Sequence, residues 1–142
     1  MFRIAGGVFL GYVAMFVTIF LAFSGLYLVL GSGRTFQEGS YEVTWSWLLG
    51  SILLSFVAAM IGGKVCAIIT GRPTAVMTLA VVVLVLGVLS AVGVDAGKLT
   101  VRTGDASLYE AIVNAKEPTW FTLLLPIVGV VGVLAGGRIR KT

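Results

Sequence analysis

Four long apolar runs constrain the fold of this chain more than any other feature of its sequence. The clearest example begins at Glu42 and ends at Lys64: an acid and two tryptophans come first, an apolar stretch follows, and two glycines precede the final cation. Apolar runs of about 18 residues or more are long enough to cross a bilayer as helices. The four runs lie at about 4–30, 44–69, 73–94 and 118–135. They predict an all-α polytopic membrane protein, a bundle of four transmembrane helices in a single integral membrane domain.

The composition supports a membrane protein. Hydrophobic residues make up 58% of the chain and charged residues 11%, whereas a soluble domain carries about 25% charged residues. The first run follows Arg3 and at its start resembles a secretory signal peptide. Its apolar stretch is longer than the about 7–15 residues of a signal-peptide core. We therefore predict an uncleaved first span.

The connections between the runs also carry structural signals. A very short link joins the second and third runs, where Gly71 suits a helix C-cap and Pro73 suits the first residue of a helix. A link this short predicts that the two helices are antiparallel neighbours. Between the third and fourth runs, Ser107 and Glu110 have the spacing of a capping box. That spacing predicts a short extracytoplasmic helix at about 108–115.

Small side chains recur along the predicted helices. In lipid, helices associate by close van der Waals approach, so small residues mark the faces that pack. In the second run, small residues recur every fourth position and share one face. The predicted helix-packing residues are Gly7, Gly11, Ser51, Ser55, Ala59, Gly63, Gly129, Gly132 and Gly136. The third run has few small residues, and we predict that it faces lipid more than the others do.

Aromatic and cationic residues mark the ends of the predicted spans. Tryptophan is enriched at membrane interfaces, and lysine and arginine are enriched on the cytoplasmic side. The predicted interfacial or lipid-phosphate residues are Trp45, Trp47, Lys64, Arg72, Trp120 and Arg138. An even number of spans places both termini on one side, and that side carries six cations and no acid. The sequence therefore predicts a multi-pass protein of the cell membrane with both termini in the cytoplasm.

Two short motifs occur twice. E-x-T-W occurs at Glu42–Trp45 and Glu117–Trp120, and G-G-[KR] occurs at Gly62–Lys64 and Gly136–Arg138. One interpretation is a parallel duplication of a helical hairpin, in which spans two and four are equivalent and cross in the same direction. The alternative is convergence, because any helix that crosses this way favours tryptophan at one end and a cation at the other. The sequence leaves both interpretations open.

Reactive groups are scarce in the four spans. The chain has one cysteine, Cys66, and no histidine, which excludes an internal disulfide and leaves few ligands for a transition metal. The spans contain no Asp, Glu, His, Asn or Gln, so proton-coupled transport is not expected. Ser51 and Ser55 are candidates for lining a pore, although helical hydroxyls usually bond to their own backbone or to a neighbour. We predict no catalytic residue, no cofactor and no metal site.

These features predict a non-enzymatic small integral membrane protein, a structural or accessory subunit that associates through its small-residue helix faces. The alternative is a small channel or passive transporter, which would have to be oligomeric because four helices leave little room for a pore. The expected partners are the lipid bilayer and either further copies of this chain or other membrane subunits. Nucleic acid is not expected, because the net charge of +4 is not arranged as a basic stripe with interleaved aromatics.

Overall fold

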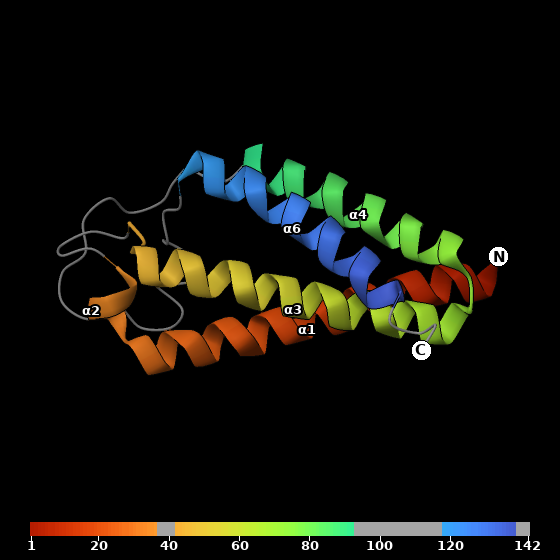
Figure 1. Ribbon diagram of the computed structural model, residues 1–142, viewed down its shortest axis with the longest axis horizontal. Coiled ribbons are helices and arrows are strands. Elements are labelled where there is room, and N and C mark those ends of the chain that lie inside the picture. The colour runs from red at the N-terminus through yellow and green to blue at the C-terminus, as the bar shows by residue number, and fades with distance from the viewer. Residues whose placement is uncertain (37–41, 93–117, 139–142) are drawn as a thin grey trace.

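The computed structural model describes residues 1–36, 42–92 and 118–138, and over these residues it is helical. The four long helices are α1 (Phe2–Leu30), α3 (Trp45–Thr70), α4 (Pro73–Val92) and α6 (Thr119–Arg138), and α2 (Ser32–Thr35) is short. Each long helix is long and apolar enough to cross a membrane. Successive long helices alternate in direction and form a bundle (Figure 1). The predicted all-α fold with four membrane spans is confirmed.

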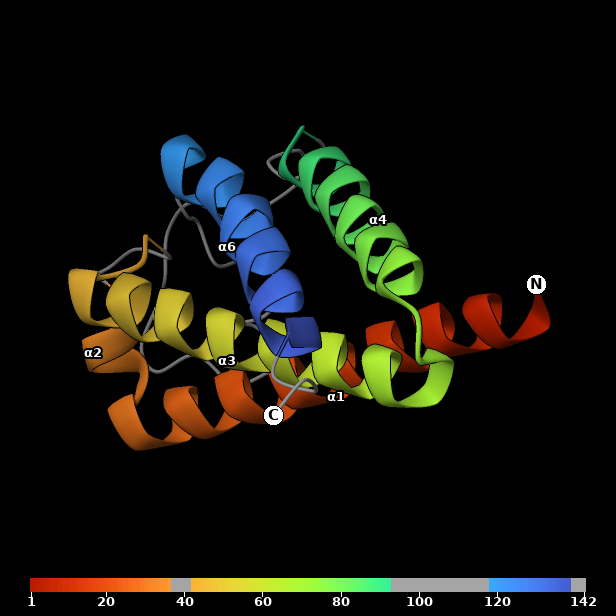
Figure 2. The same cartoon turned by 45° about the vertical axis from the view of Figure 1, so that its right-hand side comes forward.

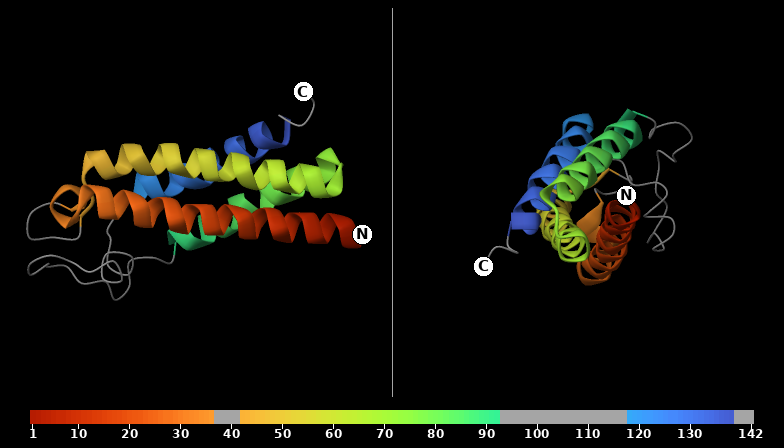
Figure 3. Two further views of the ribbon diagram at one scale, coloured as in Figure 1. Left: turned by 90° about the horizontal axis from the view of Figure 1, so that it is seen from below. Right: turned by 90° about the vertical axis from the view of Figure 1, so that its right-hand side faces the viewer.

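Three helix–helix contacts account for most of the packing in the bundle. Helix α3 packs along α1 on one side and along α6 on the other, and α6 also packs along α4. The start of α1, the link between α3 and α4, and the end of α6 lie at one end of the bundle, here named the link end (Figure 1). The opposite end is named the α2 end. Towards the α2 end α4 rises away from α1, whereas α1 and α3 stay side by side (Figures 2 and 3).

The helices begin and end within three residues of the predicted boundaries. Helix α3 stops at Gly71, which has a left-handed φ of 68° and donates its backbone N–H to the carbonyl of Ala67 at 2.9 Å. Glycine suits this position because it adopts positive φ without steric cost. Pro73 is the first residue of α4, as predicted. The short helix predicted at about 108–115 lies outside the described residues.

The described residues on either side of 37–41, between α1 and α3, pack against the bundle. Phe36 and Val43 form an isolated antiparallel bridge, and both side chains are buried. They join a cluster at the α2 end that also contains Tyr27, Leu48 and Phe121. The backbone N–H of Thr44 donates to the carbonyl of Thr35 at 2.8 Å. These residues therefore extend the apolar core beyond the end of the first span.

The prediction that the third span faces lipid most is wrong. In the most apolar window of each helix, 11% of α1 is buried against 28% of α4. Helix α4 buries Ala75, Leu79 and Ala80 against its neighbours. Helix α1 lies at the outside of the bundle beside α3, so most of its circumference stays free. The exposure of a helix to lipid therefore depends on where the helix lies in the bundle. The sizes of its residues alone do not reveal that position.

Candidate functional site

Helices α3 and α6 run in the same direction and cross at small residues. A β-carbon at Gly63 would overlap the carbonyl oxygen of Val133, and a β-carbon at Gly136 would overlap the carbonyl of Met60. Each helix thus presents a glycine to a backbone carbonyl of the other. Backbones approach this closely only where no side chain intervenes, which is the usual use of glycine between membrane helices.

Helix α1 meets α3 through glycines near the link end. A β-carbon at Gly11 would lie 2.9 Å from the carbonyl oxygen of Gly62 and 2.9 Å from Cβ of Cys66. One turn earlier, Gly7 lies against the methyl group of Thr70. The small residues of α1 therefore fix its contact with α3 over only the part of the helix nearest the link end.

All nine residues predicted to pack between helices are buried inside this chain. The serines show this most clearly, since Ser51 is 0% and Ser55 9% exposed. On α6, a β-carbon at Gly132 would lie 2.6 Å from that of Ala59. The small-residue faces are therefore occupied by helices of the same chain, so they are not free for a second subunit.

The predicted interfacial residues divide into three groups. Trp45 and Trp120 are exposed at the α2 end, with ring centroids 6.0 Å apart. Trp47 instead points into the bundle, where its ring lies 5.5 Å from that of Phe23. Residues two apart on a helix differ by about 200°, so Trp45 and Trp47 face opposite ways. The cations Lys64, Arg72 and Arg138 are exposed towards the link end.

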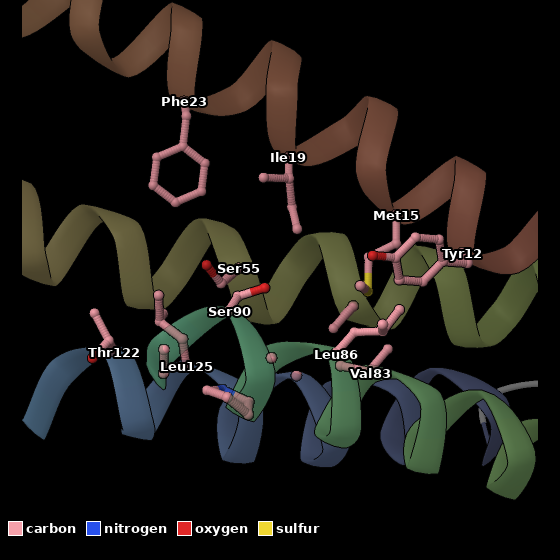
Figure 4. A pocket seen from close by; sticks show the side chains of 15 residues that line it. Tyr12, Met15, Ile19, Phe23, Ser55, Val83, Leu86, Ser90, Thr122 and Leu125 are labelled. Carbon is pink, nitrogen blue, oxygen red and sulfur yellow. The ribbon is translucent and has the colours of Figure 1, made fainter. Parts of the chain in front are cut away.

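A cavity of about 400 Å³ lies between the four long helices (Figure 4). Each long helix contributes to its wall. The lining residues are Tyr12, Met15, Ile19, Phe23, Ser55, Ala59, Val83, Leu86, Gly87, Ser90, Ala91, Thr122, Leu125, Pro126 and Gly129. The wall is mainly apolar, and its polar atoms include the hydroxyls of two serines, a threonine and a tyrosine.

Four threonine hydroxyls in the long helices bond to the backbone of their own helix. Thr18 donates to the carbonyl of Ala14 at 2.7 Å, and the same pattern recurs at Thr70, Thr78 and Thr122. The serines of α3 differ. The Ser51 hydroxyl is buried without a hydrogen-bond partner, as is the indole nitrogen of Trp47. Ser55, one turn further along, lines the cavity, and its hydroxyl also has no hydrogen-bond partner among the described residues.

The hydroxyls of the cavity lie at different depths. Ser90 and Thr122 are close to the ends of α4 and α6 at the α2 end. Ser55 lies ten residues beyond Trp45 on α3, which is about 15 Å along the helix. With Trp45 at the membrane interface, as the sequence predicts, that distance would correspond to half of a hydrocarbon layer about 30 Å thick. The cavity thus carries one hydroxyl well inside the bundle as well as hydroxyls near the α2 end.

Sequence reasoning found Ser55 but missed most of the wall. Tyr12, Met15, Ile19 and Phe23 recur at intervals of three or four residues on α1, the spacing of one helix face. That pattern marks a face but does not distinguish a packed face from one that borders a void. Only the divergence of α1 and α4 turns these side chains into a cavity wall.

The wall of the cavity offers few reactive groups among the described residues. Among the described residues no group of three or more His, Cys, Asp or Glu side chains is placed to hold a metal ion. The fifteen lining residues are uncharged and offer apolar contact plus a few hydroxyls. Comparison with known proteins finds no matching family model, no matching curated protein and no matching solved structure.

Proposed function

We propose that this small integral membrane protein is a non-enzymatic structural or accessory subunit of a membrane assembly. The observation that supports it best is the tight contact between α3 and α6, here named the α3–α6 joint. In it, Gly63 of α3 and Gly136 of α6 each lie against a backbone carbonyl of the other helix. Packing of this kind makes a rigid body in lipid. A rigid four-helix body suits a protein that holds other membrane components in place.

Association with other subunits would use the lipid-facing surface, because the small-residue faces are occupied within the chain. A shallow apolar groove runs along the outside of the joint between α3 and α6. Its walls include Leu49, Leu53, Ile127 and Val131, which are exposed by 52–65% in this chain. The groove suits a helix of another subunit or of a second copy, since both of its walls are helices of membrane-spanning length.

The alternative, a small oligomeric channel, draws some support from the hydroxyls in the cavity. Against it, the α3–α6 joint closes the half of the bundle nearer the link end, where Gly63 meets Val133 and Gly137 lies beside Val76. A continuous path within one chain would have to open this joint. A path between copies would have to run along large apolar side chains.

The test uses cross-linking in native membranes. Cys66 is the chain's one cysteine and is fully buried, so Leu53→Cys adds a single accessible thiol in the groove. A thiol-reactive photo-cross-linker attached there should then form, on illumination, a covalent adduct with a second subunit without needing a cysteine in that subunit. Leu89→Cys is the matched control, because Leu89 is as exposed as Leu53 but lies on α4.

The outcomes distinguish the candidates. An adduct from position 53 and none from position 89 supports the subunit role. A chain that stays monomeric in native membranes and gives no adduct at position 53 overturns it. Solute flux through vesicles that contain only the purified protein would favour the channel instead.

A further inference from the structure

We infer that the cavity between the four helices binds an uncharged lipid that carries a hydrogen-bonding oxygen, and that this oxygen bonds to the Ser55 hydroxyl. This inference goes beyond the proposed function, which requires no ligand. The volume of about 400 Å³ lies within the about 300–1,000 Å³ typical of ligand pockets. A mainly apolar wall with a few placed polar groups is also the composition expected of such a pocket.

The shape of the cavity selects a slender occupant. On α1 the wall runs from Tyr12 to Phe23, which corresponds to about 16 Å along the helix. A segment of α-helix of that length and about 10 Å across would occupy about 1,250 Å³. That is more than the about 1090 Å³ of empty space in this region, which also counts open space outside the bundle. A single hydrocarbon chain fits the space, whereas a transmembrane helix of a partner protein does not.

The depth of Ser55 and the absence of charge in the wall select an uncharged lipid. All fifteen lining residues are uncharged, and Ser55 lies about 15 Å along α3 from the level of Trp45. A charged headgroup stays at the membrane surface because moving a charge to the centre of the bilayer is costly. A phospholipid therefore keeps its oxygens away from Ser55. A lipid with only a hydroxyl or carbonyl group reaches this depth at a much lower cost than a charged group, and a hydrogen bond to Ser55 would offset that cost.

The Ser55 side chain provides the polar contact. It is 9% exposed, lines the cavity and lacks a hydrogen-bond partner among the described residues. Figure 4 shows its side chain on α3 close to that of Ser90, at the cavity that Ile19 and Phe23 line from α1. A hydroxyl without a partner in an apolar environment is unfavourable. A bound oxygen atom at hydrogen-bonding distance would remove that cost.

The experiment reconstitutes the full chain in phosphatidylcholine vesicles with a photoreactive probe. The probe is a long-chain fatty alcohol that carries a diazirine in its chain, and the matched probe is the same alkane without the hydroxyl. Mass spectrometry then maps the adducts. We expect adducts of the alcohol on wall residues such as Ile19 and Leu86. The alcohol should label them about three to ten times more than the alkane does, the range for one hydrogen bond.

Two variants, each with a matched control, test the contact with Ser55 and the position of the probe in the cavity. Ser55→Ala should reduce labelling by the alcohol to the level of the alkane, whereas Ser46→Ala, an exposed serine on the same helix, should leave it unchanged. Ala91→Phe fills the wall and should abolish labelling by both probes, whereas Leu89→Phe on the lipid-facing side of α4 should not. Circular dichroism establishes that each variant is folded.

Three kinds of result would overturn the inference, and the first can be observed in either of two ways. The first is equal labelling by the alcohol and the alkane, or unchanged labelling in Ser55→Ala. The second is labelling spread evenly over lipid-facing residues such as Leu53 and Val81. The third is a partner protein cross-linked at Leu86 in native membranes, which would show that a helix fills this space.

Discussion

The carbonyl oxygen of Val133 lies so close to Gly63 that a β-carbon at that position would overlap it. The same relationship recurs between Met60 and Gly136. Membrane helices gain little from hydrophobic exclusion, because lipid chains are as apolar as their side chains. Close backbone contact therefore contributes a large share of the association energy between α3 and α6. This joint should be the part of the bundle most sensitive to added volume.

Replacing Gly63 with alanine should lower the free energy of unfolding by about 1–3 kcal/mol, because the added methyl group must push the helices apart. Unfolding in detergent micelles, followed by circular dichroism, measures the change. The matched control is Gly6→Ala, since a β-carbon at Gly6 meets nothing within 4 Å. Alanine also favours helix over glycine by about 0.5–1 kcal/mol, so the control should be at least as stable as the parent. An equal loss in both variants would contradict the close contact.

For Ser51, in contrast to Gly63, replacement with alanine is not expected to lower the free energy of unfolding. Its hydroxyl is buried without a partner, and such a group destabilises a protein by its desolvation cost. Ser51→Ala should therefore leave stability unchanged or raise it by up to about 1 kcal/mol. Ser51→Val adds volume at a position with no free space and should lower stability by about 1–3 kcal/mol. A clear loss of stability in Ser51→Ala, measured by the same unfolding assay, would mean that the hydroxyl has a partner.

The two tryptophans of α3 should respond differently to lipid. Trp45 is 70% exposed and Trp47 8% exposed. In variants that retain one tryptophan each, with phenylalanine at the other two positions, brominated phosphatidylcholine should quench the fluorescence of Trp45 strongly and that of Trp47 weakly. Trp120, 50% exposed beside Trp45, serves as a second lipid-facing reference. Equal quenching of Trp45 and Trp47 would show that Trp47 faces lipid.

Much of the fold could be predicted because a bilayer imposes strong constraints on sequence. Apolar length located the four spans, and the special backbone preferences of glycine and proline located the ends of helices at Gly71 and Pro73. Small residues at Gly63 and Gly136 also marked positions where backbones meet. These features depend on local chemistry, which the sequence records directly.

The remaining features depend on how whole helices are placed. The burial of Trp47 against Phe23 requires α1 to lie on that side of α3. The exposure of α1 follows from its position at the outside of the bundle, and Phe36 is buried because it packs in the cluster with Tyr27 and Val43 at the α2 end. The cavity exists because α4 leaves α1 towards the α2 end (Figure 2). None of these arrangements has a periodic signature in a single sequence.

Orientation in the membrane gives the last prediction. Arg3, Lys64, Arg72 and Arg138 lie towards the link end, and the enrichment of cations on the cytoplasmic side predicts that this end faces the cytoplasm. Buried Cys66 gives a low background, so added thiols report topology. Thr74→Cys at the link end should react with a membrane-impermeant maleimide only after the cells are permeabilised. Glu42→Cys at the α2 end should react in intact cells, and the reverse pattern would place both ends of the chain outside.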